Sequence, residues 1–176
     1  MIRVALEKRD RCAGSSNVHY FIADAENIPV KSGLIDVAVF SGILHHLENP
    51  HIVIKDTIRA LVPGGRFLGI ENNSSAFRSI FDFLMRMKRL WKEKAHVEHF
   101  IINRHELERW FKEAGVSVKT WTSIFLPPHI LNFFRVQQAE WLIRVTDAIC
   151  ERLPWVHLQG GLILFSGRKE LSERKA

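Results

Sequence analysis

The segment from Leu34 to Phe40 (LIDVAVF) is the sequence feature that most constrains the fold. It is apolar except for Asp36, and a nearly continuous apolar run is typical of a strand buried on both faces of a parallel sheet. An amphipathic helix is predicted at Pro50–Leu61, followed by a turn at Pro63-Gly64-Gly65 and a second strand at Arg66–Glu71. A strand, a helix and another strand in this order predict a mainly parallel α/β sheet.

The rest of the chain continues this alternation of strands and helices. A short buried strand is predicted at Val18–Ala23, ahead of the central one. Asn103 followed by Glu106 is typical of a capping box at the start of a helix. The other predicted elements are the end of a helix at Met1–Ala13, a basic amphipathic helix at Ser75–Trp91, helices at Asn103–Ala114 and Phe133–Leu153, and strands at Val116–Thr122 and Gly161–Gly167.

Composition excludes several classes of protein. The 176 residues are 47% hydrophobic and 25% charged, which is the balance of a globular domain. Two cysteines, Cys12 and Cys150, do not form a disulfide framework and fit a reducing compartment. Because the first ten residues have no apolar core and no run is long enough to cross a bilayer, we expect a cytoplasmic protein.

The positive charge is concentrated in one segment. The net charge is +6, and residues 78–94 hold six cations and two anions. A basic amphipathic helix of this kind fits the surface of an anionic membrane, so the protein is also a candidate for peripheral membrane contact. The competing interpretation is a helix face whose charges are merely solvated. Nucleic acid is not expected as a partner, because basic and aromatic residues are not interleaved on a recognisable binding fold.

Three motifs follow one another at the ends of the predicted strands. Asp24-Ala25-Glu26 comes after the first strand, and Ser41-Gly42 ends the second and leads into Leu44-His45-His46-Leu47. Leu61-Val62-Pro63-Gly64-Gly65 precedes the third strand. In open α/β sheets, ligands bind beyond the carboxyl ends of the strands, so the first two motifs are candidates for a binding site.

Together these motifs resemble a known family. The segments DAENIPV, LIDVAVFSGILHHL, LVPGGRFLGIE, HELERWFKEAGVSV and GLILFSGRK are similar to the ubiquinone/menaquinone-biosynthesis-like (type 11) branch of class I S-adenosylmethionine-dependent methyltransferases. The resemblance implies a Rossmann-like sheet and S-adenosylmethionine as cofactor. It also implies transfer of a methyl group to a small-molecule or lipid-like acceptor, an apolar one if the Phe-, Leu- and Trp-rich variable segments form its site.

The resemblance assigns cofactor-binding roles to five residues. Asp24 would accept a hydrogen bond from the adenine amino group, and Ala25 would contact adenine through its backbone. Ser41 would place its backbone beside the methionine portion of the cofactor, where Gly42 lets the chain turn closely. His46 is the fifth candidate, as a contact or proton acceptor. Asp24 as a plain turn residue and Ser41 as a plain strand terminator are the competing interpretations.

No catalytic residue is assigned by the sequence. The sequence leaves open whether His99 lies near the acceptor and acts as a weak general base. A cluster of acidic and histidine side chains also raises the question of a metal, but its spacing fits no standard zinc pattern, and we expect no metal site. Its members are His96, Glu98, His99 and His105.

One part of the family pattern has no counterpart in the sequence. Nothing in Met1–Val18 matches the glycine-rich loop or the acidic strand end that bind the cofactor in the family. The resemblance therefore implies a partial Rossmann-like sheet that lacks the first two strands and carries helical additions. In the family order 3-2-1-4-5-7-6, Val18–Ala23 would then lack a neighbour and Leu34–Phe40 would become an exposed edge. An earlier start, a partner supplying the missing half and a non-functional remnant are the three explanations.

These expectations define a domain plan and two functions. An incomplete methyltransferase domain is predicted over residues 1–170, with a cofactor-side core at 18–71, acceptor-side helical segments at 72–102 and 125–156, and a flexible tail at 171–176. The leading function is methyl transfer, impaired in this chain by the lack of the loop. The alternative is a non-catalytic remnant that acts as a membrane-surface or protein-interaction module.

Overall fold

The computed structural model describes residues 2–11, 17–75, 102–125 and 134–171. The basic segment 78–94, His96, Glu98, His99 and the tail beyond Leu171 lie outside these residues. The described elements are helices α1 (Ile2–Arg11), α2 (Pro50–Ala60), α4 (Arg104–Glu113) and α6 (Val136–Cys150), 3₁₀ turns η2 (Leu44–His46) and η3 (Val156–Leu158), and strands β1 (Ile35–Ser41), β2 (Leu61–Asn72), β3 (Val118–Ser123) and β4 (Leu162–Arg168).

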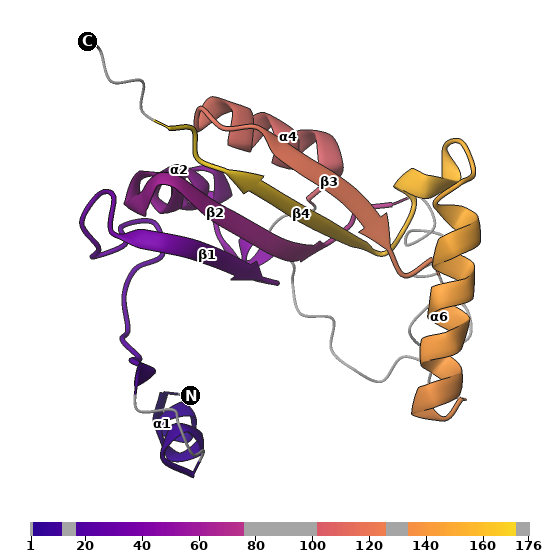
Figure 1. Ribbon diagram of the computed structural model, residues 1–176, viewed down its shortest axis with the longest axis horizontal. Helices are drawn as coiled ribbons and strands as arrows, with labels where there is room; N and C mark the ends of the chain where they lie inside the picture. Colours follow the sequence, from indigo (N-terminus) through magenta and orange to yellow (C-terminus); the bar gives the residue numbers. More distant parts are fainter. Residues whose placement is uncertain (1, 12–16, 76–101, 126–133, 172–176) are drawn as a thin grey trace.

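The described strands form one mixed α/β sheet, in the order β1-β2-β4-β3. β1 and β2 are parallel, whereas β4 runs antiparallel to both β2 and β3. This order is that of the last four strands of the family sheet, so the predicted partial Rossmann-like fold is confirmed. β1, β2 and β3 all run in the same direction, because β4 is antiparallel to both β2 and β3. The carboxyl ends of these three strands therefore lie at one edge of the sheet, with α6 beside it (Figure 1).

The hydrophobic core lies on the sheet face that α2 and α4 cover (Figure 1). Phe67 of β2 stacks on Phe111 of α4 with ring centroids 4.6 Å apart, and Phe165 of β4 lies 5.4 Å from Phe111. All three rings are almost completely buried. Because truncation of a buried phenylalanine to alanine costs about 3–5 kcal/mol, this aromatic cluster is a main source of stability.

The cap of α4 is as the sequence predicts. The Asn103 side chain accepts a hydrogen bond from the Glu106 N–H at 2.9 Å, which satisfies one of the unpaired donors of the first turn. Glu106 provides a negative charge in that first turn, where it interacts favourably with the helix dipole.

The Pro63-Gly64-Gly65 segment corrects one expectation. It lies inside β2, which begins directly after α2 at Leu61, and is not a turn ahead of the strand. The pairing jumps from Ile35↔Leu61 to Val37↔Arg66, so the extra residues form a bulge on the β2 side. Gly64 has a φ of +79°, a value that residues other than glycine rarely adopt.

The predicted strand at Val18–Ala23 is wrong: the structure assigns no strand there. Phe21 and Ile22 are 64% and 83% exposed. An extended apolar segment becomes a strand only when a neighbour pairs with its N–H and C=O groups. Among the described residues no strand lies beside this segment, as the resemblance implies for a chain without the first two strands.

β1 is an edge strand, as expected. Along the described sheet it pairs only with β2, and Val37 and Val39 are 51% and 67% exposed. Phe40, on the other face, is buried in the core. An apolar edge with unpaired backbone groups is a template for pairing with another chain.

We therefore expect Val39→Lys to reduce self-association of the 176-residue chain, because a lysine on an edge strand disfavours edge-to-edge pairing. The free energy of unfolding should change by no more than about 0.5 kcal/mol, as for other surface substitutions. Light scattering over a concentration series measures the effect. Ile52→Lys on the exposed side of α2 is the control, and equal suppression by both variants would contradict a role for the β1 edge.

Candidate functional site

The turn that follows β1 begins at Gly42. Its φ is +59°, and its N–H donates to the Ile70 carbonyl of β2 at 2.9 Å. Ser41, the last residue of β1, is exposed at this edge and pairs in register with Ile70. The glycine therefore lets the chain leave the strand sharply, directly beyond the carboxyl ends of two parallel strands.

Glu71 fixes this turn from β2. Its side chain is completely buried, and its Oε1 accepts hydrogen bonds from the backbone N–H groups of Ile43 and Leu44, both at 2.7 Å. Its Oε2 lies 2.7 Å from Nδ1 of His45. Glu71 was not among the residues that the sequence predicted for the site. The signal that could have found it was an acidic residue at the end of the predicted strand Arg66–Glu71, one strand away from a candidate site.

The two adjacent histidines have different environments. His45 is buried by the turn and by Glu71, whereas His46 is exposed, with ring centroids 4.0 Å apart. Nε2 of His45 lies 3.5 Å from the side-chain nitrogen of Asn72. His45 is thus part of the internal hydrogen-bond network, and of the two rings that of His46 is the one accessible to a ligand.

Glu26 attaches the Asp24-Ala25-Glu26 segment to the connection between β1 and α2. Its Oε1 accepts hydrogen bonds from the N–H and the side-chain amide of Asn49, at 3.1 and 3.2 Å. Asn49 is the residue before α2. Among the sequence-predicted residues, Asp24 and Ala25 are therefore on a segment that Glu26 attaches to the connection between β1 and α2. Ser41, Gly42 and His46 lie at the start of that connection.

Asp24 itself is exposed. Its Oδ1 accepts a hydrogen bond from the Glu26 N–H at 2.9 Å, and its carbonyl accepts from Asn27. This is the turn role that the sequence left as a competing interpretation. It uses one carboxylate oxygen, and the described residues make no hydrogen bond to Oδ2, so the turn role does not exclude a ligand contact.

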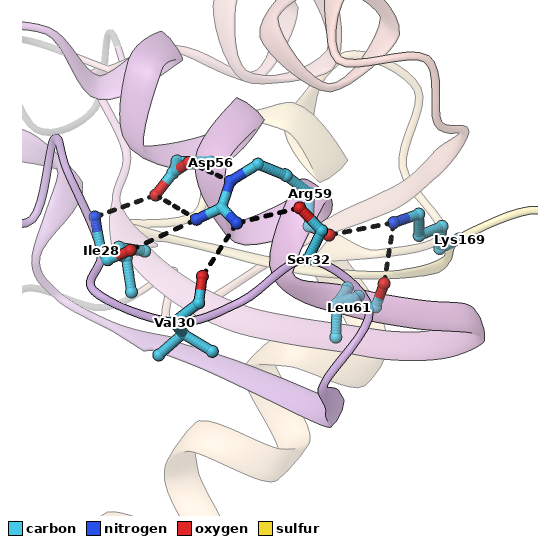
Figure 2. Close-up of polar contacts among 7 residues, drawn as sticks. All are labelled: Ile28, Val30, Ser32, Asp56, Arg59, Leu61 and Lys169. Carbon is cyan, nitrogen blue, oxygen red and sulfur yellow. Dashed lines mark hydrogen bonds and ion pairs between the residues drawn. The ribbon is translucent and has the colours of Figure 1, made fainter.

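Asp56 and Arg59 of α2 fix the continuation of this loop (Figure 2). Arg59 bonds to both oxygens of Asp56, at 2.6 and 3.1 Å, and donates to the Val30 carbonyl at 2.8 Å. Asp56 accepts from the Ile28 N–H at 2.9 Å. Lys169, near the end of β4, donates to the Leu61 carbonyl at 2.7 Å where β2 begins. The loop after Asp24 is therefore held along α2 by backbone and side-chain contacts.

The hydrogen bond from Arg59 holds the pKa of Asp56 below its ordinary value of 3.8, with a smaller contribution from the Ile28 N–H; partial burial opposes both. A carboxyl group whose pKa is lowered in the folded state stabilises the protein above its unfolded pKa. That stabilisation is lost as the pH falls through the folded pKa.

We expect Asp56→Asn to lower the free energy of unfolding at pH 7. The difference in free energy of unfolding between the variant and the parent chain, which is the gap to be followed, should shrink below about pH 4. Urea unfolding at pH 7, 5, 4 and 3 measures it. Asp36→Asn removes an aspartate at the start of β1, outside this network, and is the control. A gap that stays constant from pH 7 to pH 3 would show that the carboxylate charge is not the source of the stabilisation.

The ends of β3 and α6 lie at the same edge of the sheet as Ser41, but on the side away from β1. Asp147 of α6 accepts a hydrogen bond from the Ser123 hydroxyl at 2.5 Å and from the Ile124 N–H at 3.1 Å. The buried Asn73, just after β2, donates to the Gly160 carbonyl at 2.7 Å. The end of α6 and the loop before β4 are therefore fixed at the same sheet edge as Ser41.

Within the described ranges, no three His, Cys, Asp or Glu side chains form a group that would hold a metal ion. The described helices include none that is both long enough and apolar enough to span a membrane.

Comparison with known proteins identifies the family. Residues 3–120 match the methyltransferase domain family. Two curated relatives are ubiquinone/menaquinone biosynthesis C-methyltransferases, from Vibrio vulnificus (30% identical over 77 residues) and Idiomarina loihiensis (32% over 87 residues). The matches cover 44% and 47% of this chain, but only 30% and 34% of the relatives' own length.

Solved structures agree on the fold. A methyltransferase from Thermotoga maritima, described as a possible histamine N-methyltransferase, matches with a TM-score of 0.61 at 18% identity, over 96% of this chain and 70% of its own. A Haemonchus contortus phosphoethanolamine N-methyltransferase, solved with S-adenosyl-L-methionine, has a TM-score of 0.61 at 14% identity, over 97% of this chain and 41% of its own. The chain belongs to the class I S-adenosylmethionine-dependent methyltransferase family, and the cofactor of that family is S-adenosylmethionine.

Proposed function

We propose that this chain contributes the adenine-side and methionine-side contacts of an S-adenosylmethionine site, in an enzyme that methylates a small or lipid-like acceptor. The observation that carries the proposal is the position of the turn after β1. Gly42 turns the chain beyond the carboxyl ends of two parallel strands, and Glu26 attaches the Asp24 loop to Asn49, at the end of the connection that this turn begins. In α/β sheets of this type, ligands bind at that edge.

The residues present fit the chemistry of the cofactor. Oδ2 of Asp24 is an exposed acceptor that suits the amino group of adenine, and the backbone of Ala25 lies beside it. Ser41 and Gly42 present backbone groups where the resemblance puts the methionine portion. His46 offers an exposed ring at the end of the same turn.

When bound, the cofactor supplies a methyl group on a positively charged sulfur. The chain's own residues contribute orientation. The turn after β1 is fixed by Glu71, and the Asp24 loop is fixed by Glu26 and by the pair Asp56–Arg59. Holding the reactants in one geometry supplies much of the rate in a transfer of this kind. No described residue is assigned as a general base.

The acceptor is proposed from the relatives. Two of them are named as C-methyltransferases of ubiquinone/menaquinone biosynthesis, so a quinone-like ring with a lipid tail is the acceptor class that we favour. The acceptor side is proposed in the two variable segments 72–102 and 125–156. In the described part of the second segment, α6 lies at the sheet edge near the end of β3. A partner chain alongside β1 and contact with a membrane surface stay predictions. The comparisons match methyltransferases and do not support the alternative of a non-catalytic module.

We expect the 176-residue chain to bind S-adenosylmethionine weakly, with an affinity in the millimolar range. Met1–Val18 contains no glycine-rich loop and no acidic strand end for the ribose, so only the contacts described above would act. Titration followed by amide chemical shifts should move the signals of Asp24–Glu26 and Ser41–His46. Tight stoichiometric binding would contradict the expected impairment.

In a completed domain that also carries the glycine-rich loop, Asp24→Ala should weaken cofactor binding by about 10- to 150-fold, the value of a hydrogen bond to a charged group. Asp24→Asn should cost less, because an amide oxygen still accepts. Asp36→Ala, which also removes an exposed aspartate but lies at the amino end of β1, is the matched control. If Asp24→Ala and Asp36→Ala bind the cofactor equally well, Asp24 is only a turn residue.

A further inference from the structure

The buried carboxylate of Glu71 is surrounded by polar groups of the turn after β1. Three donors converge on it, from two consecutive backbone N–H groups and one histidine ring, all at 2.7 Å. Its side chain has no solvent exposure, and that of His45 is 8% exposed. Placing a carboxylate here is costly unless its hydrogen bonds are satisfied, and they are satisfied by the turn of the proposed cofactor site.

The contacts also fix where the His45 ring carries its proton. Both backbone N–H groups bond to Oε1, so Oε2 is the acceptor for an N–H at Nδ1. On the other side of the ring, the side-chain amide of Asn72 lies 3.5 Å from Nε2. A carboxylate accepts hydrogen bonds and donates none, so the arrangement places a ring proton on Nδ1, facing Oε2 of Glu71.

We propose that Glu71 is a positioning residue. It orders the turn from Gly42 to His46 through two backbone hydrogen bonds and through the tautomer of His45, and so presents the turn to the cofactor. This inference rests on the proposed function, because it assigns a consequence for cofactor binding. Glu71 and His45 then act together. A substitution at Glu71 changes the position of the proton on the His45 ring, although Glu71 itself has no solvent exposure.

Glu71→Gln separates positioning from packing, because it preserves shape. The amide oxygen still accepts from Ile43 and Leu44, but the amide nitrogen donates, so Nδ1 must become an acceptor and the ring proton must move to Nε2. Glu48→Gln is the matched control, because it removes an exposed carboxylate from the same connection between β1 and α2 without touching His45. Mere packing of Glu71 would not move a proton on the ring.

The experiment is nitrogen-15 spectroscopy of the 176-residue chain, with amide hydrogen exchange and an S-adenosylmethionine titration on the same samples. We expect the His45 proton to be on Nδ1 in the parent chain and in the Glu48→Gln control, and on Nε2 in Glu71→Gln. Glu71→Ala should speed exchange at Ile43 and Leu44 by at least about tenfold. The apparent affinity read from the Gly42 amide should fall by about tenfold in Glu71→Gln.

Two results would overturn the proposal. One is a parent chain whose His45 proton is on Nε2, which needs no variant to fold. The other is a Glu71→Gln chain in which the proton moves but Gly42 responds to the cofactor as in the parent. If Gly42 of the parent does not respond to S-adenosylmethionine at any concentration, the proposed function fails and the cofactor role of Glu71 fails with it. The tautomer and exchange results would still decide whether Glu71 orders the turn.

Discussion

The parallel pairing of β1 and β2 is the constraint on which the rest of the site depends. It brings Ser41 level with Ile70, so the first turn residues after β1 lie beside the last residues of β2. Only in this register does the carboxylate of Glu71 reach the backbone of Ile43 and Leu44. The bulge at Pro63-Gly64-Gly65 sets the register, because it places the extra β2 residues before the pairing from Val37 onwards begins.

The same pairing explains how the adenine-side loop reaches the site. α2 connects β1 to β2 and lies across the sheet face, and both of its ends bind the loop that follows Asp24. Asn49 at its start donates to Glu26, and Asp56 and Arg59 near its end hold Ile28 and Val30. The phenylalanines of the core pack α4 against the sheet. The Asp24 loop, the turn after β1 and the strands therefore form one connected structure.

The sequence predicted those parts of the fold that depend on local pattern. Apolar runs, the Asn103 cap and the glycine-marked helix end located β1, α2, α4 and β4 to within a few residues. The strand that the sequence predicted at Val18–Ala23 is wrong, because a strand requires a neighbouring strand to pair with. A local sequence pattern does not show whether that neighbour is present. The sequence placed Pro63-Gly64-Gly65 in a turn, because a bulge within a strand uses the same residues as a turn.

For the site, the order of motifs made Asp24, Ser41-Gly42 and, of the two adjacent histidines, His46 the candidates, but it did not show why the two rings have different environments. That distinction is set by Glu71, some 26 positions away along the chain, through a contact that exists only in the folded sheet. Glu71, Glu26 and the Asp56–Arg59 pair are the residues that position the candidate site, and each acts through tertiary contacts. The acceptor side has no comparable sequence pattern, so it could be assigned only to a region.

Photolabelling with radioactive S-adenosylmethionine is the most direct test of where the cofactor binds. The chain would be irradiated with the labelled cofactor, digested, and its labelled peptides sequenced, with excess S-adenosylhomocysteine as competitor. The account predicts label in the peptides that contain Asp24–Glu26 and Ser41–His46, and its loss with the competitor. Label that the competitor does not displace, or that is confined to peptides away from the ends of β1 and β2, would contradict it.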